Sequence, residues 1–208
     1  MTAAVVYVHG LWLTGAESWL LQRRVCERHG WSWHTFGYHS TLSTLDAIAA
    51  SLGTYLAGID APSLHLVGHS MGGIVIHRLM QRAPVLPPGR VVLLGTPARP
   101  SRAAATLRAN AFGRLMLGAA VAGLTAEMER RWDSERELGL VVGTRPLGLA
   151  QIVVHFEEPN DGTVAVAETR LPGAKARLEL PVSHTGMLFS TRVADAVGNF
   201  LERGAFGE

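Results

Sequence analysis

The sequence is poor in cysteine, and this sets the first limit on how the chain is held together. Cys26 is the only cysteine among 208 residues, so no disulfide can form within the chain. It lies in the apolar, helix-like stretch SWLLQRRVCERHG without a second cysteine or a set of metal ligands nearby, so we expect an inert, packed thiol. A chain of this length is enough for one well-buried core and short for two, so we expect a single domain over residues 1–208.

The sequence also lacks a strong charge of either sign and a long hydrophobic run. Its 19 Lys and Arg residues nearly balance 17 Asp and Glu residues, and no basic run interleaved with aromatics occurs, so we expect no nucleic-acid partner. The longest apolar run, LMLGAAVAGL at 115–124, is far shorter than the ~20 residues of a membrane-spanning helix. The start, MTAAVVYVHG, has neither the positive segment nor the cleavage site of a signal peptide. We therefore expect a soluble, cytoplasmic protein without a transmembrane segment.

Motifs for metals and common cofactors are missing as well. The histidines do not cluster with acids at ligand spacing, and neither C-x-x-C nor H-E-x-x-H occurs. The glycines around Ser70 match neither the dinucleotide-binding pattern nor the phosphate-loop pattern. We therefore expect no metal and no cofactor.

What the chain does show is an alternation of strand-like and helix-like segments. Strand-like runs, most of them continuously apolar as in strands buried on both faces, occur at 3–8, 31–38, 63–68, 90–95, 150–156 and 175–180. Amphipathic stretches with helical spacing separate most of them. This alternation predicts an α/β fold, with a mostly parallel sheet of about six strands and helices on both faces. The long mixed segment 98–148 is expected to be a short cap or lid inserted between strands.

Ser70 stands at the junction between the apolar run LHLV and a helix-like stretch. It lies at the centre of Gly68-His69-Ser70-Met71-Gly72, which fits the G-x-S-x-G pattern of a nucleophile elbow. A strand that turns abruptly into a helix leaves no room for side chains two positions either way, which explains the glycines. The turn would raise the hydroxyl above the sheet at a helix N-terminus, where developing negative charge is favoured. The alternative interpretation is an ordinary capped helix start.

A serine nucleophile needs a base, and three histidines follow Ser70 in the chain. His77 lies two turns along the helix that leaves the elbow and cannot reach back to the serine, and His155 lies within a predicted strand. His184 lies in a loop after the last strand, in PVSHTGML, where the base is expected. We therefore predict His184 as the base.

The acid that orients the base is expected between the serine and the histidine in the chain. The stretch after AQIVVHF offers Glu157, Glu158 and Asp161. Asp161 is favoured because PNDGT is a turn that holds a short carboxylate in a defined place, whereas the two glutamates fit the solvated end of a strand. Asp195 follows the histidine and lies in a predicted helix, so its place in the chain order is wrong.

Two backbone N–H groups are expected to bind the oxyanion that forms when a serine attacks a carbonyl. One is the N–H of Met71, the residue after the nucleophile, and the other comes from the loop after the first strand. In HGLW, Gly10 permits a tight turn that directs the N–H of Leu11 inward, with Trp12 as an alternative donor. His9 is expected to support this loop through hydrogen bonds. An ordinary strand-ending turn is the alternative interpretation.

These motifs together resemble those of the α/β-hydrolase superfamily, and especially its small bacterial lipase/esterase-like members. An HG in the first loop, GHSMGG at the elbow, Asp161 in an NDG turn and a late SH follow in the family's order from His9 to His184. The resemblance implies the α/β-hydrolase fold and a triad of Ser70, His184 and Asp161. The chain begins at the strand bearing VYVHG, so we expect a minimal sheet without two strands common in larger relatives.

The expected function is that of a serine hydrolase that cleaves carboxylic esters of small molecules through an acyl-enzyme. The same triad would also serve an acyltransferase, a thioesterase or an amidase, and a non-catalytic member of the fold would only bind a ligand. The oligomeric state stays open.

The substrate is expected to bind between the elbow and the segment 98–148. Trp12, Phe112 and Met187 are the candidate apolar walls, and an apolar helix over the serine would suit an acyl chain; a helix packed on the sheet is the alternative. A group of arginines would attract a carboxylate, a phosphate or an acyl-CoA head group, although a solvated helix face explains them as well. These are Arg99, Arg102, Arg108 and Arg114.

Overall fold

The computed structural model describes residues 2–99, 105–106, 131–148, 156 and 158–207. One sheet of six strands lies at its centre, in the order β2-β1-β3-β4-β5-β6, and every neighbouring pair is parallel. All strands therefore finish at the same end of the sheet, which we call the carboxyl end, and begin at the opposite, amino end. The strands are β1 (Ala4–Val8), β2 (Ser32–Phe36), β3 (Leu64–His69), β4 (Val91–Leu94), β5 (Leu138–Gly143) and β6 (Ala176–Leu180).

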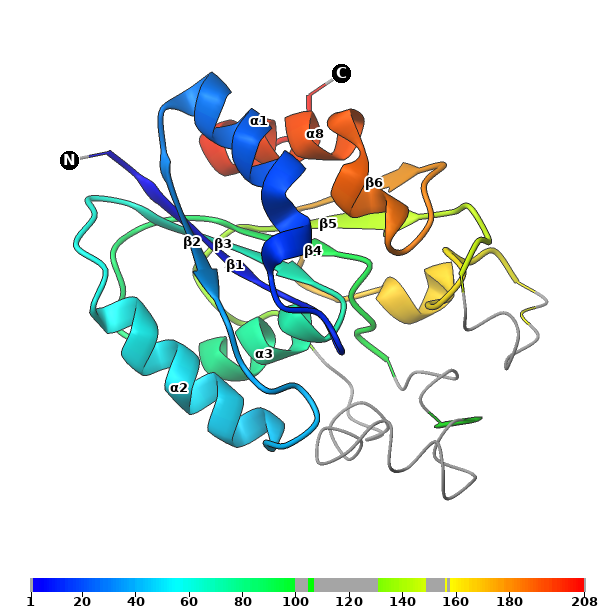
Figure 1. The fold of residues 1–208 in the computed structure, drawn as a ribbon, viewed down its shortest axis with the longest axis horizontal. Coiled ribbons are helices and arrows are strands. Elements are labelled where there is room, and N and C mark those ends of the chain that lie inside the picture. The colour runs from blue at the N-terminus through cyan, green and yellow to red at the C-terminus, as the bar shows by residue number, and fades with distance from the viewer. Residues whose placement is uncertain (1, 100–104, 107–130, 149–155, 157, 208) are drawn as a thin grey trace.

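Helices cover both faces of this sheet, as Figure 1 shows. On one face α1 packs against α8, and on the other α2 packs against α3. The described connections also contain the short 3₁₀ helices η1, η3 and η4. The bounds are η1 (Ala16–Ser18), α1 (Trp19–His29), α2 (Leu45–Ala57), α3 (Met71–Met80), η3 (Val166–Thr169), η4 (Gly186–Phe189) and α8 (Thr191–Arg203).

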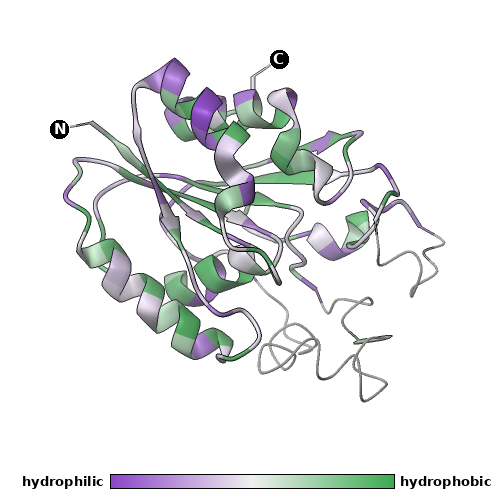
Figure 2. Ribbon diagram, in the orientation of Figure 1, coloured by the Kyte–Doolittle hydropathy of each residue, from purple (hydrophilic) through white to green (hydrophobic). Residues whose placement is uncertain are grey.

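The strands contribute side chains to a core on each face of the sheet. In β1, Ala4, Val6 and Val8 join the core under α2 and α3, whereas Val5 and Tyr7 join the core under α1 and α8. Successive side chains of a strand point to opposite faces, so a strand covered on both sides must be apolar throughout. Figure 2 shows the result: the strands are largely apolar, and hydrophilic residues gather on the outer surface of α1.

The predicted α/β class and parallel sheet of six strands are confirmed, but the fifth strand is not where the sequence predicts it. β5 consists of Leu138–Gly143, inside the segment 98–148, so the predicted cap is wrong at that end. The run LGLVVG is fully buried, and a short apolar run of this kind does not reveal from its pattern alone which element it forms. Apart from residue 156, the predicted strand at 150–156 lies outside the described residues, as do 100–104 and 107–130 of the predicted cap.

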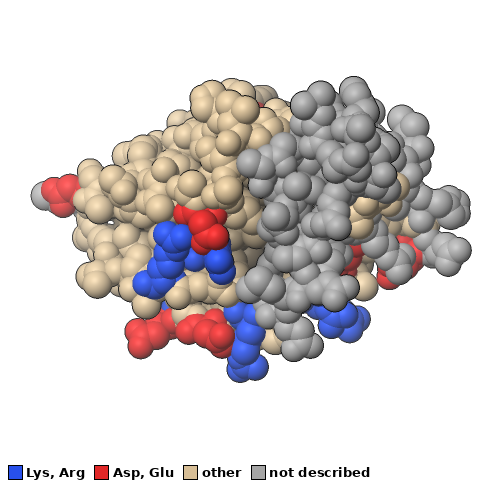
Figure 3. All heavy atoms as spheres, turned by 90° about the horizontal axis from the view of Figure 1, so that it is seen from below, with Lys and Arg blue, Asp and Glu red and all other residues tan. Residues whose placement is uncertain are grey.

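Charged side chains on the described surface lie largely in pairs of opposite sign. Asp46 on α2 is 2.8 Å from the guanidinium of Arg78 and 2.9 Å from that of Arg82, and Arg24 on α1 is 3.0 Å from Asp195 on α8. Figure 3 shows acidic and basic side chains next to one another on the face seen from below. Exposed pairs of this kind link neighbouring helices but add little stability each. None of the described helices has the length and apolar character needed to cross a bilayer.

Candidate active site

Ser70 lies at the carboxyl end of β3, between the last residue of the strand, His69, and the first residue of α3, Met71. Its backbone has φ 53° and ψ −121°, a conformation that residues other than glycine rarely adopt. Strain of this kind costs about 1–3 kcal/mol and persists only where the surrounding structure enforces it. The N–H of Ser70 donates to the carbonyl oxygen of Leu94 at 2.8 Å, which fastens the corner to β4. Ser70 therefore occupies a sharp, strained corner between a strand and a helix.

Two glycines after Ser70 allow neighbouring segments to approach this corner. A Cβ at Gly72 would lie 2.0 Å from the carbonyl oxygen of Val8, and a Cβ at Gly73 would lie 2.1 Å from Oγ1 of Thr96. The Thr96 hydroxyl in turn donates to the carbonyl oxygen of Ser70 at 3.1 Å. The end of β1, the corner and the loop after β4 are thus packed together, and only glycine fits between them.

Asp161 and His184, the predicted acid and base, are in direct contact. Nδ1 of His184 lies 2.7 Å from Oδ2 of Asp161, and both side chains are buried. The other carboxylate oxygen accepts the backbone N–H groups of Thr163 and Val164 at 2.9 and 2.7 Å, which fixes the orientation of the carboxylate. Because an ionised carboxylate only accepts, we assign the bridging proton to Nδ1 of His184. Nε2 is then left with a lone pair that can take a proton.

The acid–base pair and the serine meet at the carboxyl end of the sheet. A Cβ at Gly95, just after β4, would lie 3.1 Å from both Oδ2 of Asp161 and Nδ1 of His184, so the pair packs against this turn. The rings of His69 and His184 have centroids 4.8 Å apart. The hydroxyl of Ser70 makes no hydrogen bond to another described residue. In serine hydrolases the hydrogen bond between serine and histidine is often long without substrate and tightens when substrate binds.

His9 and Gly10 shape the loop after β1. Nδ1 of His9 lies 2.8 Å from the carbonyl oxygen of Gly10, and Nε2 accepts the N–H of Tyr38 at 3.3 Å. A carbonyl only accepts and an N–H only donates, so we assign the proton to Nδ1. Burial lowers the pKa of His9, which keeps the ring neutral in this role. A Cβ at Gly10 would lie 3.1 Å from Cβ of Ser70, so the loop held by His9 touches the elbow.

The two candidate oxyanion donors of this loop differ in what they bind. The N–H of Trp12 donates to Oγ of Ser40 at 3.1 Å and is therefore occupied. The N–H groups of Leu11 and Met71 make no hydrogen bond to any other residue in the described part of the chain. The structure therefore favours Leu11 over Trp12 as the partner of Met71.

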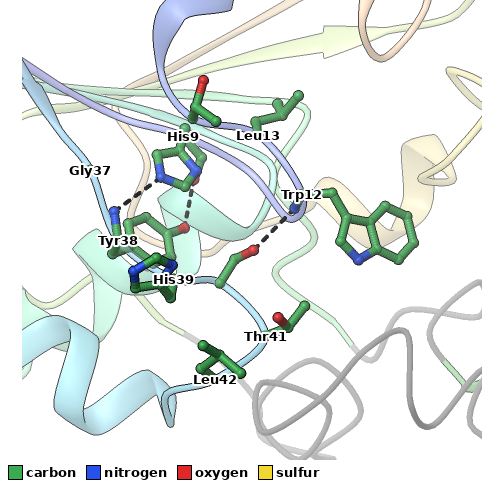
Figure 4. A pocket seen from close by; sticks show the side chains of 10 residues that line it. His9, Trp12, Leu13, Gly37, Tyr38, His39, Thr41 and Leu42 are labelled. Atoms are coloured by element: carbon green, nitrogen blue, oxygen red, sulfur yellow. Dashed lines mark hydrogen bonds between the residues drawn. The ribbon is translucent and has the colours of Figure 1, made fainter.

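A pocket of about 630 Å³ opens beside the same loop and the loop after β2 (Figure 4). Trp12, one of the predicted substrate walls, belongs to it and is 52% exposed. None of the described residues that line it is Lys, Arg, Asp or Glu, so this part of the pocket suits an uncharged group. Sequence reasoning missed it because two loops form it, and the only signal is that both follow strands of one sheet. Its lining residues are His9, Trp12, Leu13, Thr14, Gly37, Tyr38, His39, Ser40, Thr41 and Leu42.

Of the other two predicted substrate walls, only Met187 is among the described residues, and it does not line this pocket. Met187 is fully buried in the core under α1 and α8, so its side chain presents no surface to the pocket in this structure. A Cβ at Gly95 would lie 3.1 Å from Cε of Met187, which shows that the thioether packs against the turn that also supports the acid–base pair. Phe112 lies outside the described residues, as do three of the four arginines: Arg102, Arg108 and Arg114.

The alternatives to the acid–base pair are placed differently. His77 is buried on α3, and its Nε2 contacts the carbonyl oxygen of Arg131 at 2.8 Å. His155 and Glu157 lie outside the described residues.

Burial raises the pKa of the Cys26 thiol, which disfavours the reactive thiolate. In the described ranges, no group of three or more His, Cys, Asp or Glu side chains is arranged to hold a metal ion.

The chain is similar to known proteins over nearly its whole length. The model of a family described as the alpha/beta hydrolase family matches residues 5–197. A solved lipase from Bacillus licheniformis has a TM-score of 0.67 at 19% identity, over 89% of this chain and 86% of the lipase. A lipase-esterase related protein from Clostridium acetobutylicum has a TM-score of 0.67 at 10% identity, over 96% of this chain and 93% of that one. A pyrethroid hydrolase has a TM-score of 0.68 at 15% identity, over 98% of this chain and 99% of the hydrolase. No curated protein matches the chain by sequence.

Proposed function

Because the chain belongs to the alpha/beta hydrolase family, we propose that it is a serine hydrolase that cleaves carboxylic esters. In this proposal Ser70 is the nucleophile, His184 the general base and Asp161 the acid that orients the base. The observation that carries it is the 2.7 Å contact between His184 and Asp161, buried at the same end of the sheet as the strained Ser70. A serine, a base and an orienting acid are the parts that acyl transfer requires.

The first half of the reaction forms an acyl-enzyme. Oγ of Ser70 attacks the ester carbonyl carbon while Nε2 of His184 takes the hydroxyl proton, and the carbonyl electron pair moves onto oxygen. The N–H groups of Leu11 and Met71 bind this oxyanion. The intermediate then collapses, the bond to the leaving oxygen breaks, and His184 gives its proton to that oxygen. Alcohol departs, and the acyl group stays on Ser70.

The second half repeats these steps with water. His184 takes a proton from water as its oxygen attacks the acyl carbon, and the same N–H groups bind the second oxyanion. Collapse releases the carboxylic acid and returns the proton to Ser70. Asp161 favours each step in which His184 is charged, because a carboxylate next to Nδ1 stabilises an imidazolium. Losing one oxyanion donor typically removes about 2.7–4 kcal/mol of transition-state stabilisation.

An uncharged ester is the substrate class that the surroundings favour. The pocket beside the Leu11 loop includes the half-exposed Trp12, and none of its described lining residues is charged. A neutral acyl or alcohol group can enter it without leaving an unpaired charge, whereas a charged group would lose its hydration without compensation. Similar structures include a lipase and a pyrethroid hydrolase, which agrees with such substrates.

The direct test is hydrolysis of p-nitrophenyl esters with acyl chains from acetyl to palmitoyl. We expect turnover by the wild type and a loss on the order of a million-fold in Ser70→Ala, as removal of a triad nucleophile causes in other hydrolases. Ser63→Ala is a matched control, because its Oγ donates to the carbonyl of Pro88 at the amino end of the sheet and it should keep full activity. Undiminished turnover by Ser70→Ala would contradict the proposal.

A fluorophosphonate probe separates the proposal from its alternatives. Labelling of Ser70 without ester turnover would indicate a nucleophile that serves a thioester or an amide. Added alcohols, thiols or amines that divert the acyl group from water would indicate an acyltransferase. Neither labelling nor turnover would support a ligand-binding member of the fold that has no catalytic role.

A further inference from the structure

His69, the residue before Ser70, is itself a buried histidine, and its side chain makes a hydrogen bond to a residue far along the chain. Its side chain is 1% exposed, and Nε2 lies 3.1 Å from the carbonyl oxygen of His184, 115 residues further along the chain. A carbonyl oxygen only accepts, so Nε2 carries the proton and donates it. We infer that His69 is a positioning residue that fixes the main chain of His184 relative to Ser70. This inference rests on the proposed triad and adds a residue to it.

The backbone of His184 is held on both sides. Its N–H donates to the carbonyl oxygen of Asp161 at 2.8 Å, and its own carbonyl oxygen accepts from His69. One anchor therefore comes from the loop of the acid, and the other from the residue covalently joined to the nucleophile. Any shift of the His184 loop away from Ser70 must break the hydrogen bond to His69.

The chemistry of the His69 site favours a donor over simple packing. Nδ1 of His69 is buried without a hydrogen-bond partner, a cost that an apolar side chain of the same size would not carry. The ring also lies next to the loop after β1, because a Cβ at Gly10 would be only 3.1 Å from Nδ1. The imidazole is thus held between the Leu11 loop and the His184 loop. What histidine supplies here, and leucine would not, is the N–H that reaches His184.

The His69 ring also stays neutral while His184 takes and gives protons in the proposed reaction. Burial, together with the charge of nearby His184, lowers the pKa of His69 to about 3. His69 therefore does not compete with His184 for the serine proton, and it places no positive charge beside the imidazolium that forms during the reaction.

Three substitutions test this role. Gln places an amide N–H at about the position of Nε2, Asn is one methylene too short to reach His184, and Leu removes the donor. We expect His69→Leu and His69→Asn to lower kcat by about 10²-fold, the usual effect of a small misplacement of a catalytic group, with KM little changed. We expect His69→Gln to recover most of that loss. The Gln and Asn variants are equally polar, so their comparison stands even where the Leu variant does not fold.

A matched control lies on the same strand. His65 is also a buried histidine, but at the amino end of β3, where its Nδ1 accepts the N–H of Arg90. His65→Leu should reduce stability and leave kcat of the folded protein unchanged. If the His69 variants lose activity only in proportion to their folded fraction, as His65→Leu would, then His69 is a packing residue and the inference is wrong.

A second readout does not depend on any substrate. The proton between Nδ1 of His184 and Asp161 should give a strongly downfield resonance in the proton NMR spectrum of the wild type at low temperature. We expect this resonance to broaden or shift in His69→Leu and His69→Asn and to be kept in His69→Gln and His65→Leu. An unchanged resonance in all four variants would overturn the inference. If the wild type cleaves no ester, the proposed function fails, and the resonance still decides the role of His69.

Discussion

Strand β3 carries a buried histidine near each end, and the two are used differently. At the amino end, His65 accepts the N–H of Arg90 and stacks on Trp31 with ring centroids 5.0 Å apart. At the carboxyl end, His69 donates to the backbone of His184 and lies beside its ring. Both pKa values are lowered mainly by burial, to about 4 for His65 and about 3 for His69. Burial and a shifted pKa therefore do not by themselves mark a catalytic histidine.

The two ends of β3 differ in how completely the polar groups around them are paired. At the amino end, Glu137 pairs with Arg90 and with Lys175, and the guanidinium of Arg136 donates to the carbonyl oxygens of Leu64 and Pro87. These bonds pair the charged groups at the amino end of the sheet with partners within the protein. At the carboxyl end, the Ser70 hydroxyl and the N–H groups of Leu11 and Met71 have no hydrogen-bond partner among the described residues. Polar groups left open beside a strained serine are what a reacting substrate can use.

Pocket size does not distinguish the two ends. A pocket of about 840 Å³ at the amino end is larger than the one beside Trp12. Its lining includes Arg90, Arg136, Glu135 and Glu137, so acids and bases are mixed there. Its lining also includes serines and a histidine, but no contact between them is found among the described residues: Oγ of Ser63 donates to the carbonyl oxygen of Pro88, and Nδ1 of His65 accepts the N–H of Arg90. The chemistry of the side chains, more than the volume of the pocket, favours the carboxyl end as the candidate active site.

Among variants that keep Ser70, the largest expected effect comes from removing the charge of Asp161. In Asp161→Asn one oxygen can still accept the N–H groups of Thr163 and Val164, but the amide cannot stabilise a charged His184 and favours the wrong tautomer. We expect the rate of fluorophosphonate labelling to fall about 10⁴-fold, as in other triads, with a thermal unfolding midpoint close to that of the wild type. Glu137→Gln removes a carboxylate at the amino end and should label at the wild-type rate. Similar losses of labelling rate in both variants would contradict the difference in role between the two ends of the sheet.

Glycines at the two ends should also respond differently to alanine. At Gly72 the new Cβ would meet the backbone oxygen of Val8 at 2.0 Å, and a backbone atom cannot move aside easily. We expect Gly72→Ala to lose about 3 kcal/mol of unfolding free energy through this overlap. Gly30, which ends α1 at φ 66°, has no atom within 4 Å of its Cβ position, so Gly30→Ala should lose only about 1 kcal/mol through backbone strain. Urea unfolding measures both, and equal losses would contradict the crowding at the elbow.

Acid should weaken the fold through the buried histidines. Their folded pKa values lie below the ordinary 6.5, so the unfolded chain binds protons that the folded chain does not. The stabilisation is therefore complete above pH 6.5 and is lost as the pH falls from there toward about 4, by at most about 1.4 kcal/mol per pH unit for each histidine. Urea unfolding near neutral pH and at about pH 5 should show this slope, and His65→Gln should reduce it without changing Ser70 labelling at neutral pH. An unchanged slope in His65→Gln would show that His65 does not contribute.

Much of this architecture is readable from the sequence because local patterns determine it. The apolar runs of β1, β3 and β4 predict strands covered on both faces, and the glycines around Ser70 predict a sharp corner. The chain order of Ser70, Asp161 and His184 predicts which side chains gather, and the structure brings Asp161 and His184 into contact. Their catalytic roles stay predictions until activity is measured.

The features that the sequence does not reveal depend on distant contacts. LGLVVG and AQIVVHF are both short apolar runs, and only strand pairing decides that the first becomes β5. Met187 reads as a possible substrate wall, but the packing of η4 places it in the core. The bond from His69 to His184 joins residues 115 positions apart, and no local pattern encodes it.

The parallel order of the strands also determines when the chain becomes reactive during its synthesis. No two neighbouring strands form a hairpin, so each pairing closes a long loop, and sheets rich in such distant pairings fold slowly. Ser70 follows the third strand, whereas His184 follows the sixth, at the last sheet edge to be made. A chain still emerging from the ribosome would thus carry the serine without its base. In the proposed mechanism, hydrolytic capacity arrives only with the final strand and the loop after it, so an unfinished chain would not cleave the esters around it.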